Sequence, residues 1–143
     1  MTPADLVEIE AIKQLKARYF RLMDQKRWDE WADVFTEDAT LEAVDDTRGA
    51  KAVEGRDAIV ARVRSVLGEV LSVHHGHMPE IEITGPTTAR GTWTMEDHLE
   101  FPPGGRTRVI DGRGFYFEEY AKGPDGRWRI RTLQLRRLWL RRE

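Results

Sequence analysis

Cysteine is absent from the 143-residue sequence, which excludes a disulfide-stapled scaffold and thiol catalysis. No apolar run approaches the roughly 20 residues that a membrane-spanning helix needs. A strong charge is also missing, since 25 acidic residues face 23 basic ones for a net charge of −2. That balance gives no global attraction to nucleic acid. The acidic residues 1–10 lack the apolar core of a secretory signal, and we expect a cytoplasmic protein without membrane partners.

Nucleotide-binding glycine patterns and the GxSxG elbow of serine hydrolases are absent as well. What is present is a hydrophobic fraction of 40% with Trp, Phe and Tyr spread along the chain. A chain of this length and composition predicts one folded domain over residues 1–143.

Helical patterns occupy the first half of the chain. Thr2, Pro3 and Asp5 form a helix start, with Thr at the N-cap, Pro at the first position and an acid three residues on. The apolar stripe that follows is Leu6, Ile9, Ile12, Leu15, Tyr19 and Leu22. We expect a short second helix over 28–35 and a third after Gly55 with a stripe of Ile59, Val63, Val66, Leu67 and Val70.

The second half changes to a strand pattern. Turn signals separate four β-rich segments, at 72–84, 87–101, 107–121 and 127–140, which predict an antiparallel meander. Strands of this length bend at bulges. Residues 38–53 are expected to be extended but irregular, with turns at Asp45, Asp46 and Gly49. The fold class predicted is α+β, with a curved antiparallel sheet wrapped around N-terminal helices.

One carboxylate stands on an apolar face. Along 91–101, Asp97 shares its parity with Trp93, Met95, Leu99 and Phe101 and therefore points toward the core. A buried carboxylate needs a partner. Asp97 is either a structural residue satisfied by neighbouring polar groups or a residue that orients a catalytic base or a cation.

The last strand repeats this feature at Arg137, which shares parity with Leu133, Leu135 and Trp139. Trp128 and Ile130 have the opposite parity, which predicts a slip or bulge near 131–132. Arg137 either faces inward or snorkels from the strand end into a solvated basic face. Seven arginines lie between residues 127 and 142, and acids elsewhere balance them, so a solvated face or a subunit interface is favoured over nucleic-acid binding.

Three histidines cluster in residues 74–77. His75 and His77 alternate onto one face and His74 onto the other. The pair could bind a metal, but a site needs a third ligand, and we expect no metal. A single catalytic histidine is favoured because imidazole titrates near neutral pH, although parity does not choose among the three.

The first helix offers Tyr19 on its apolar stripe and Asp24 five residues later. In isolation, Tyr19 has the pattern of a core tyrosine with one satisfied hydroxyl. Asp24 lies roughly 140° further around an ideal helix and reaches the same pocket only near the helix end.

These residues carry a resemblance to a known family. The chain resembles the SnoaL-like proteins of the nuclear transport factor 2-like superfamily and, among them, the bile-acid 7α-dehydratases. The segments that carry it are residues 9–20, Asp24, Trp28-Asp29-Glu30, His74-x-Gly76-His77-x-Pro79-Glu80-Ile81, Ala89-x-Gly91-x-Trp93-x-x-Glu96-Asp97, Phe115-Tyr116 and Asp125-Gly126-x-Trp128. The resemblance implies a cone-shaped, cystatin-like α+β barrel with a deep pocket.

Carried onto this sequence, the resemblance implies a dehydratase site of Tyr19, Asp24, His74, Asp97 and Arg137. Trp93, Met95, Leu99 and Phe115 are the expected walls for a small apolar polycyclic substrate. The expected function is a lyase without a cofactor that eliminates water from a hydroxylated oxo-polycyclic compound, steroid- or bile-acid-like, with His74 as base and Tyr19 as hydrogen-bond donor. Two alternatives stay open: a double-bond isomerase with the same pocket, and a non-catalytic ligand-binding protein.

An open sheet also leaves one face to cover. We expect a homodimer or homotrimer, with Tyr116, Tyr120 and Trp139 contributing to the covered face.

Overall fold

The computed structural model describes residues 1–44 and 52–143, and the expected turn at Asp45, Asp46 and Gly49 lies outside them. Three helices and six strands make up the described part of the chain. Their order is α1 (Pro3–Asp24), α2 (Trp28–Ala32), β1 (Phe35–Val44), β2 (Val53–Glu54), α3 (Arg56–Leu67), β3 (Leu71–Gly85), β4 (Thr88–Glu100), β5 (Val109–Lys122) and β6 (Trp128–Arg142).

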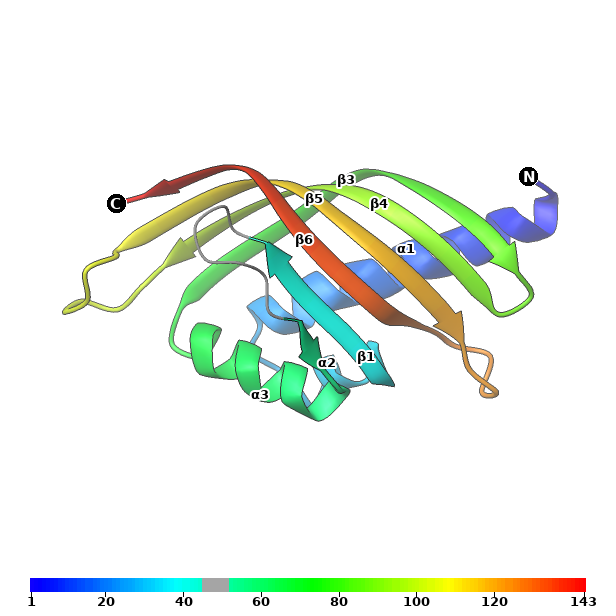
Figure 1. Ribbon diagram of the computed structural model, residues 1–143, viewed down its shortest axis with the longest axis horizontal. Helices are drawn as coiled ribbons and strands as arrows, with labels where there is room; N and C mark the ends of the chain where they lie inside the picture. Colours follow the sequence, from blue (N-terminus) through cyan, green and yellow to red (C-terminus); the bar gives the residue numbers. More distant parts are fainter. Residues whose placement is uncertain (45–51) are drawn as a thin grey trace.

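All six strands form one curved sheet in the order β2-β1-β6-β5-β4-β3. The sheet arches over α1, and α2 and α3 lie beneath one end of it (Figure 1). The α+β fold class, with N-terminal helices under a curved sheet, is confirmed. Because β3 is an edge strand and packs against α1, its inward side chains meet the helix at the border of the sheet.

Helix α1 begins as its sequence predicts. The Thr2 hydroxyl accepts the Asp5 backbone N–H at 3.1 Å, and the Asp5 carboxylate accepts the Thr2 N–H at 2.9 Å. Such a reciprocal cap contributes about 1 kcal/mol to helix stability. The expected stripe is buried from Ile12 on, at Ile12, Leu15, Tyr19 and Leu22, whereas Leu6 is exposed. The buried stripe anchors the helix against the sheet.

Strand β1 differs from the expectation in where it begins and in how it pairs. Helix α2 stops at Ala32 rather than continuing to residue 35, and Phe35 already pairs with Ile130 of β6. The pairing is parallel, so the sheet is mixed rather than wholly antiparallel. Phe35 and Ala39 are fully buried, but Glu37 and Asp38 between them break the alternation that marks a strand.

Two bulges bend β6. The register with β5 skips Arg131, which confirms the slip expected near 131–132, and it skips Leu138 as well. The second bulge separates Arg137, which pairs with Gly114, from Trp139, which pairs with Arg113. Arg137 therefore stays on the inner side while Trp139 lies on the outer face, with its ring centroid 4.8 Å from the guanidinium carbon of Arg113.

The expected faces of β5 are reversed. Tyr116 and Tyr120 are each only 1% exposed, so the expectation that they cover the outer face is wrong. Phe115 was expected in the pocket wall, but it shares its parity and a ring contact with the exposed Phe117 on the outer face. Phe115 and Phe117 are more apolar than Tyr116 and Tyr120. The two tyrosines nevertheless point inward, because their hydroxyl groups meet buried polar groups there.

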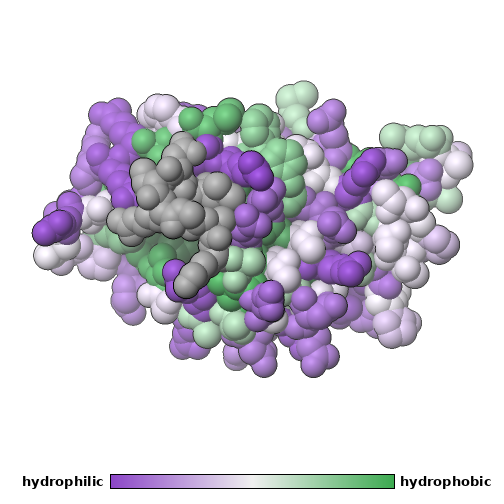
Figure 2. Space-filling view, viewed as in Figure 1, coloured by the Kyte–Doolittle hydropathy of each residue, from purple (hydrophilic) through white to green (hydrophobic). Residues whose placement is uncertain are grey.

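The core beneath the sheet is aromatic. The Tyr19 ring contacts Trp31 and Phe35 with ring centroids 5.7 and 6.1 Å apart. Hydrophilic side chains dominate the lower rim of the view in Figure 2, and hydrophobic ones show mainly toward its left and centre and reach the upper rim. Within the described residues, the helices are too short or too polar to cross a membrane.

Candidate active site

The last residue of α1 holds a histidine of the edge strand. Asp24 Oδ1 lies 2.7 Å from Nδ1 of His74, and Oδ2 accepts the His74 backbone N–H at 2.9 Å. The Ser72 hydroxyl donates to Asp24 Oδ1 at 2.9 Å, and the Lys26 ammonium donates to Ser72 at 2.7 Å. Asp24 is thus fixed from several sides and fixes the imidazole in turn.

This contact determines what His74 can do. A carboxylate only accepts hydrogen bonds, so Nδ1 donates to Asp24, and Nε2 is the nitrogen left to accept a proton whenever the ring is neutral. Nε2 lies 3.8 Å from Oδ2 of Asp97, and the His74 side chain is only 7% exposed. One carboxylate therefore fixes the orientation of the imidazole, and a second carboxylate faces its Nε2.

Asp97 is itself locked by an arginine from two strands away. Two nitrogens of the Arg137 guanidinium donate to its two oxygens, each at 2.7 Å. Such a bidentate pair fixes orientation as well as charge. The intervening strand makes room with Gly112, where an added Cβ would lie 1.7 Å from Arg137 Nη1 and 2.4 Å from Asp97 Oδ1.

Tyr19 lies deeper, in a second polar cluster. The Lys16 ammonium sits between two aromatic rings, 3.7 Å from the centroids of both Tyr19 and Tyr116. Burial raises the pKa of Tyr19 far above its usual range, and the Glu118, Asp24 and Asp97 carboxylates add to the rise while a hydrogen bond with Tyr116 opposes it. The phenol therefore stays protonated and keeps its capacity to donate a hydrogen bond.

A buried ion pair forms the floor of this cluster. Lys16 Nζ lies 2.7 Å from Glu118, and both side chains are fully buried. The Tyr120 hydroxyl donates to Glu118 at 2.7 Å and accepts the Trp93 indole N–H at 2.9 Å. Burial lowers the pKa of Lys16 to about 8, against the opposing effect of Glu118.

A cavity of about 450 Å³ opens between α1 and β3. Asp24, His74, Phe20 and Trp93 are among the residues that line it. Its volume falls within the range typical of sites for small ligands, roughly 300–1,000 Å³. The expected wall residue Trp93 lies at this cavity, so the imidazole and an apolar surface face the same space.

The remaining predicted residues are placed as follows. Met95 and Leu99 are buried on the same face of β4 as Asp97, whereas Phe115 lies on the outer face. The structure brings Asp24, His74, Asp97 and Arg137 into one chain of contacts and sets Tyr19 beside it.

Sequence reasoning missed the Lys16–Glu118 pair. Lys16 is not part of the expected apolar stripe, yet it lies four residues after Ile12 and three before Tyr19, which is helical spacing for the buried face. Glu118 shares its parity with Tyr116 and Tyr120 and faces inward with them. Periodicity alone could have identified Lys16 and Glu118, had a charged residue been accepted on a buried face.

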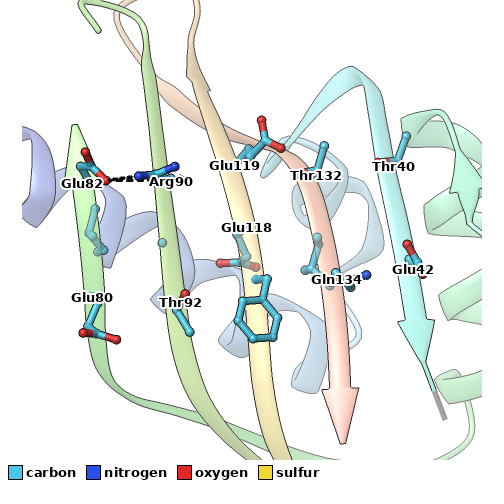
Figure 3. Close-up of a pocket in the computed structure, with 14 residues that line it drawn as sticks. Thr40, Glu42, Glu80, Glu82, Arg90, Thr92, Glu118, Glu119, Thr132 and Gln134 are labelled. Carbon is cyan, nitrogen blue, oxygen red and sulfur yellow. Dashed lines mark hydrogen bonds and ion pairs between the residues drawn. The ribbon is translucent and has the colours of Figure 1, made fainter. Parts of the chain in front are cut away.

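The outer face of the sheet holds a separate hollow of about 680 Å³. Figure 3 shows its side chains standing on β3, β4, β5, β6 and β1, which lie side by side. The hollow is rich in acids, and the Glu82 carboxylate pairs with Arg90 at 2.7 Å. None of the five predicted catalytic residues lines it, so it is distinct from the cavity at His74.

Solved structures share this fold. A candidate scytalone dehydratase from Novosphingobium aromaticivorans is 23% identical, with a TM-score of 0.86 over 100% of this chain and 92% of that chain. A protein of unknown function from Mycobacterium tuberculosis is 28% identical, with a TM-score of 0.78 over 96% of this chain and 76% of its own. A type 2 hexachlorocyclohexane dehydrochlorinase is 18% identical, with a TM-score of 0.79 over 97% and 90%.

The sequence itself gives the family. A sequence model of the SnoaL-like domain matches residues 4–134, which span every helix and all strands up to the middle of β6. The curved sheet over N-terminal helices agrees with that match. The chain belongs to the SnoaL-like domain family of the nuclear transport factor 2-like superfamily.

Proposed function

We propose that this protein is a lyase, working without a cofactor, that removes water from a hydroxylated, carbonyl-bearing polycyclic compound of the steroid or bile-acid type. The observation that carries the proposal is the Asp24–His74 contact of 2.7 Å at the wall of a ligand-sized cavity. An oriented neutral imidazole beside an apolar surface is what removal of a carbon-bound proton requires.

In the proposed reaction, Nε2 of His74 takes a proton from the carbon next to the substrate carbonyl. The electron pair of that C–H bond forms an enolate, which collapses to a C=C bond as the C–O bond of the neighbouring hydroxyl breaks. The imidazolium returns its proton to the departing oxygen, so that water leaves and His74 is restored. No electrons are gained or lost, and the step needs no redox partner.

Tyr19 is the proposed donor to the carbonyl oxygen on which negative charge gathers. A phenol is protonated at neutral pH, and burial raises the pKa of the Tyr19 hydroxyl further, so Tyr19 can donate a hydrogen bond. Hydrogen bonds placed at a developing oxyanion contribute about 10²–10³ in turnover in measured cases.

Asp97 is the proposed stabiliser of the imidazolium. Its carboxylate lies 3.8 Å from Nε2, where positive charge appears once the proton has been taken. Arg137 holds the same carboxylate in place by two hydrogen bonds. Asp24 keeps the ring turned so that Nε2, and not Nδ1, meets the substrate.

The comparisons support an elimination reaction by analogy. Two neighbours bear names that denote eliminations, a candidate scytalone dehydratase and a dehydrochlorinase. The resemblance to bile-acid 7α-dehydratases favours a fused-ring substrate, and the apolar Trp93 and Phe20 surfaces at the cavity suit such a skeleton.

The test is incubation of the purified protein with a panel of hydroxy-oxosteroids, followed by mass spectrometry. Loss of one water is expected, with turnover about 10²–10⁴ lower in His74→Ala. His98→Gln is the matched control, since His98 contacts Asp111 and Glu100 away from the cavity and its removal leaves turnover unchanged.

Other outcomes would replace the proposal. A product of unchanged mass with a shifted double bond would make the protein an isomerase. A ligand recovered unchanged that stabilises the protein against heat would favour a binding protein.

A further inference from the structure

Three side chains that the proposed dehydration does not use converge on the outer face of the sheet. His75 and His77 stand two residues apart on β3, and Glu96 stands opposite His75 on β4. Glu96 Oε1 lies 3.5 Å from Nδ1 of His75 and 3.4 Å from Nε2 of His77, and one donor atom from each of the three residues lies within 4.8 Å of the others. We propose that His75, His77 and Glu96 form a binding site for a late first-row divalent cation such as Zn²⁺.

The spacing suits tetrahedral coordination. Zinc binds imidazole nitrogen and carboxylate oxygen at roughly 2.0–2.2 Å, which sets neighbouring donor atoms about 3.4 Å apart. The two separations from Glu96 Oε1 already have this value. The side chains of His75, His77 and Glu96 are 58%, 51% and 43% exposed. The two imidazole rings therefore have room to rotate until their nitrogens also reach this spacing.

The donor chemistry selects the class of ion. Two imidazoles with one carboxylate suit Zn²⁺, Ni²⁺ and Cu²⁺, whereas Ca²⁺ and Mg²⁺ prefer all-oxygen sites. Neutral imidazole and ionised carboxylate are the forms that bind such metals.

A neighbouring arginine leaves the site open. Arg113 Nε lies 3.8 Å from the other carboxylate oxygen of Glu96, Oε2, and its guanidinium carbon lies over the Trp139 ring. Oε1 remains directed at the two histidines. Three protein ligands leave a fourth tetrahedral position open toward solvent, as in zinc sites that keep a water or another exchangeable ligand.

The site uses none of the five residues proposed for the dehydration. Strand alternation directs His74 inward to Asp24 and directs His75 and His77 outward. A third ligand, which the spacing of the histidines along the sequence did not supply, comes from the strand next to them. The cation would bind on the outer side of β3, with both of its histidines also bordering the cavity that Asp24 and His74 line.

The test is isothermal titration of the full chain, freed of any affinity tag, with zinc chloride. One Zn²⁺ per chain is expected to bind. Affinity is expected to fall at least about tenfold in His77→Gln and in Glu96→Gln, and binding should vanish in the His75→Gln/His77→Gln variant. Because all three residues are exposed, the variants should keep the native melting temperature, which is measured alongside.

The matched control is His98→Gln. His98 is a partly exposed histidine whose two nitrogens face Asp111 and Glu100 in different directions and therefore do not share one ion. Unchanged zinc affinity in this variant supports the proposal. An absence of zinc binding by the native chain would overturn it, and so would binding that survives in the double histidine variant.

Discussion

Both carboxylate oxygens of Asp24, at the end of α1, accept hydrogen bonds from His74 of β3. Oδ1 lies 2.7 Å from the ring Nδ1, and Oδ2 lies 2.9 Å from the backbone nitrogen. Side chain and main chain of one histidine are thus held by one carboxylate. The helix end and the sheet edge are joined where the candidate chemistry takes place.

Loss of the hydrogen bonds between Asp24 and His74 is expected to lower turnover more than the free energy of unfolding. In Asp24→Asn, the amide can present its N–H₂ to Nδ1 and leave Nε2 protonated, so turnover should fall by about 10²–10⁴. Steady-state kinetics on the substrate identified by mass spectrometry measure this. Ser72→Ala, which removes only a hydrogen bond to Asp24, should lose far less, and equal losses in both variants would contradict the orienting role.

Gly112 is expected to tolerate no side chain. A Cβ there would displace the Arg137 guanidinium from Asp97 and leave a buried carboxylate without its partner. Gly112→Ala should therefore lower the free energy of unfolding by about 1–3 kcal/mol in urea denaturation.

Gly105→Ala is the matched control for Gly112, because the added Cβ meets only the Thr107 carbonyl oxygen at 3.9 Å. It should stay within about 0.5 kcal/mol of the native protein. A neutral Gly112→Ala would show that the Arg137–Asp97 pair does not need the space seen here.

The buried pair of Lys16 and Glu118 is expected to be sensitive to loss of one partner. Lys16→Met leaves the Glu118 charge buried and should cost about 3–5 kcal/mol, while Lys16→Met/Glu118→Gln should recover much of that loss. Urea denaturation compares the two. The partly exposed pair of Lys122 and Glu8 provides the control, since Lys122→Met should cost less than about 1 kcal/mol.

Stability is expected to depend on pH through the same lysine. Burial lowers the pKa of Lys16 from 10.5 to about 8 in the native protein. Between these values the unfolded chain binds a proton that the native chain has released, so the free energy of unfolding rises with pH, by roughly 1 kcal/mol net from pH 8 to about pH 9.5.

Above pH 10 the sign reverses. Burial raises the pKa of Tyr19 and Tyr116, so the native chain keeps protons that unfolded tyrosines lose, and stability falls. Urea denaturation across this range measures both limbs. The Lys16→Met/Glu118→Gln variant should lack the rise, and a rise that persists in it would assign the effect to another group.

The sequence predicted those parts of the fold in which one periodicity dominates. The helix start at Thr2 and Asp5, the inward turn of Asp97 and the bulge near Arg131 all followed from spacing and parity. Prediction failed where the more apolar side chains of a strand point away from the core. On β5 the apolar Phe115 points outward, because the inward row is polar and satisfies Lys16.

Long-range pairing was the other limit. Nothing local in residues 35–44 shows that β1 runs parallel to β6, because that partner lies at the far end of the chain. The hydrogen bonds between Asp24 and His74 also depend on how α1 crosses β3. Parity placed His74 opposite His75 and His77, but only the packing of the helix shows which face meets Asp24.

The most direct test of the central claim asks whether His74 removes a carbon-bound proton. The protein is incubated in D₂O with an oxosteroid that lacks the leaving hydroxyl, and deuterium uptake next to the carbonyl is followed by mass spectrometry. The native chain should speed uptake above the buffer rate, and His74→Ala should return it toward that rate. Equal uptake in the native chain and His74→Ala would contradict the role of His74 as the base.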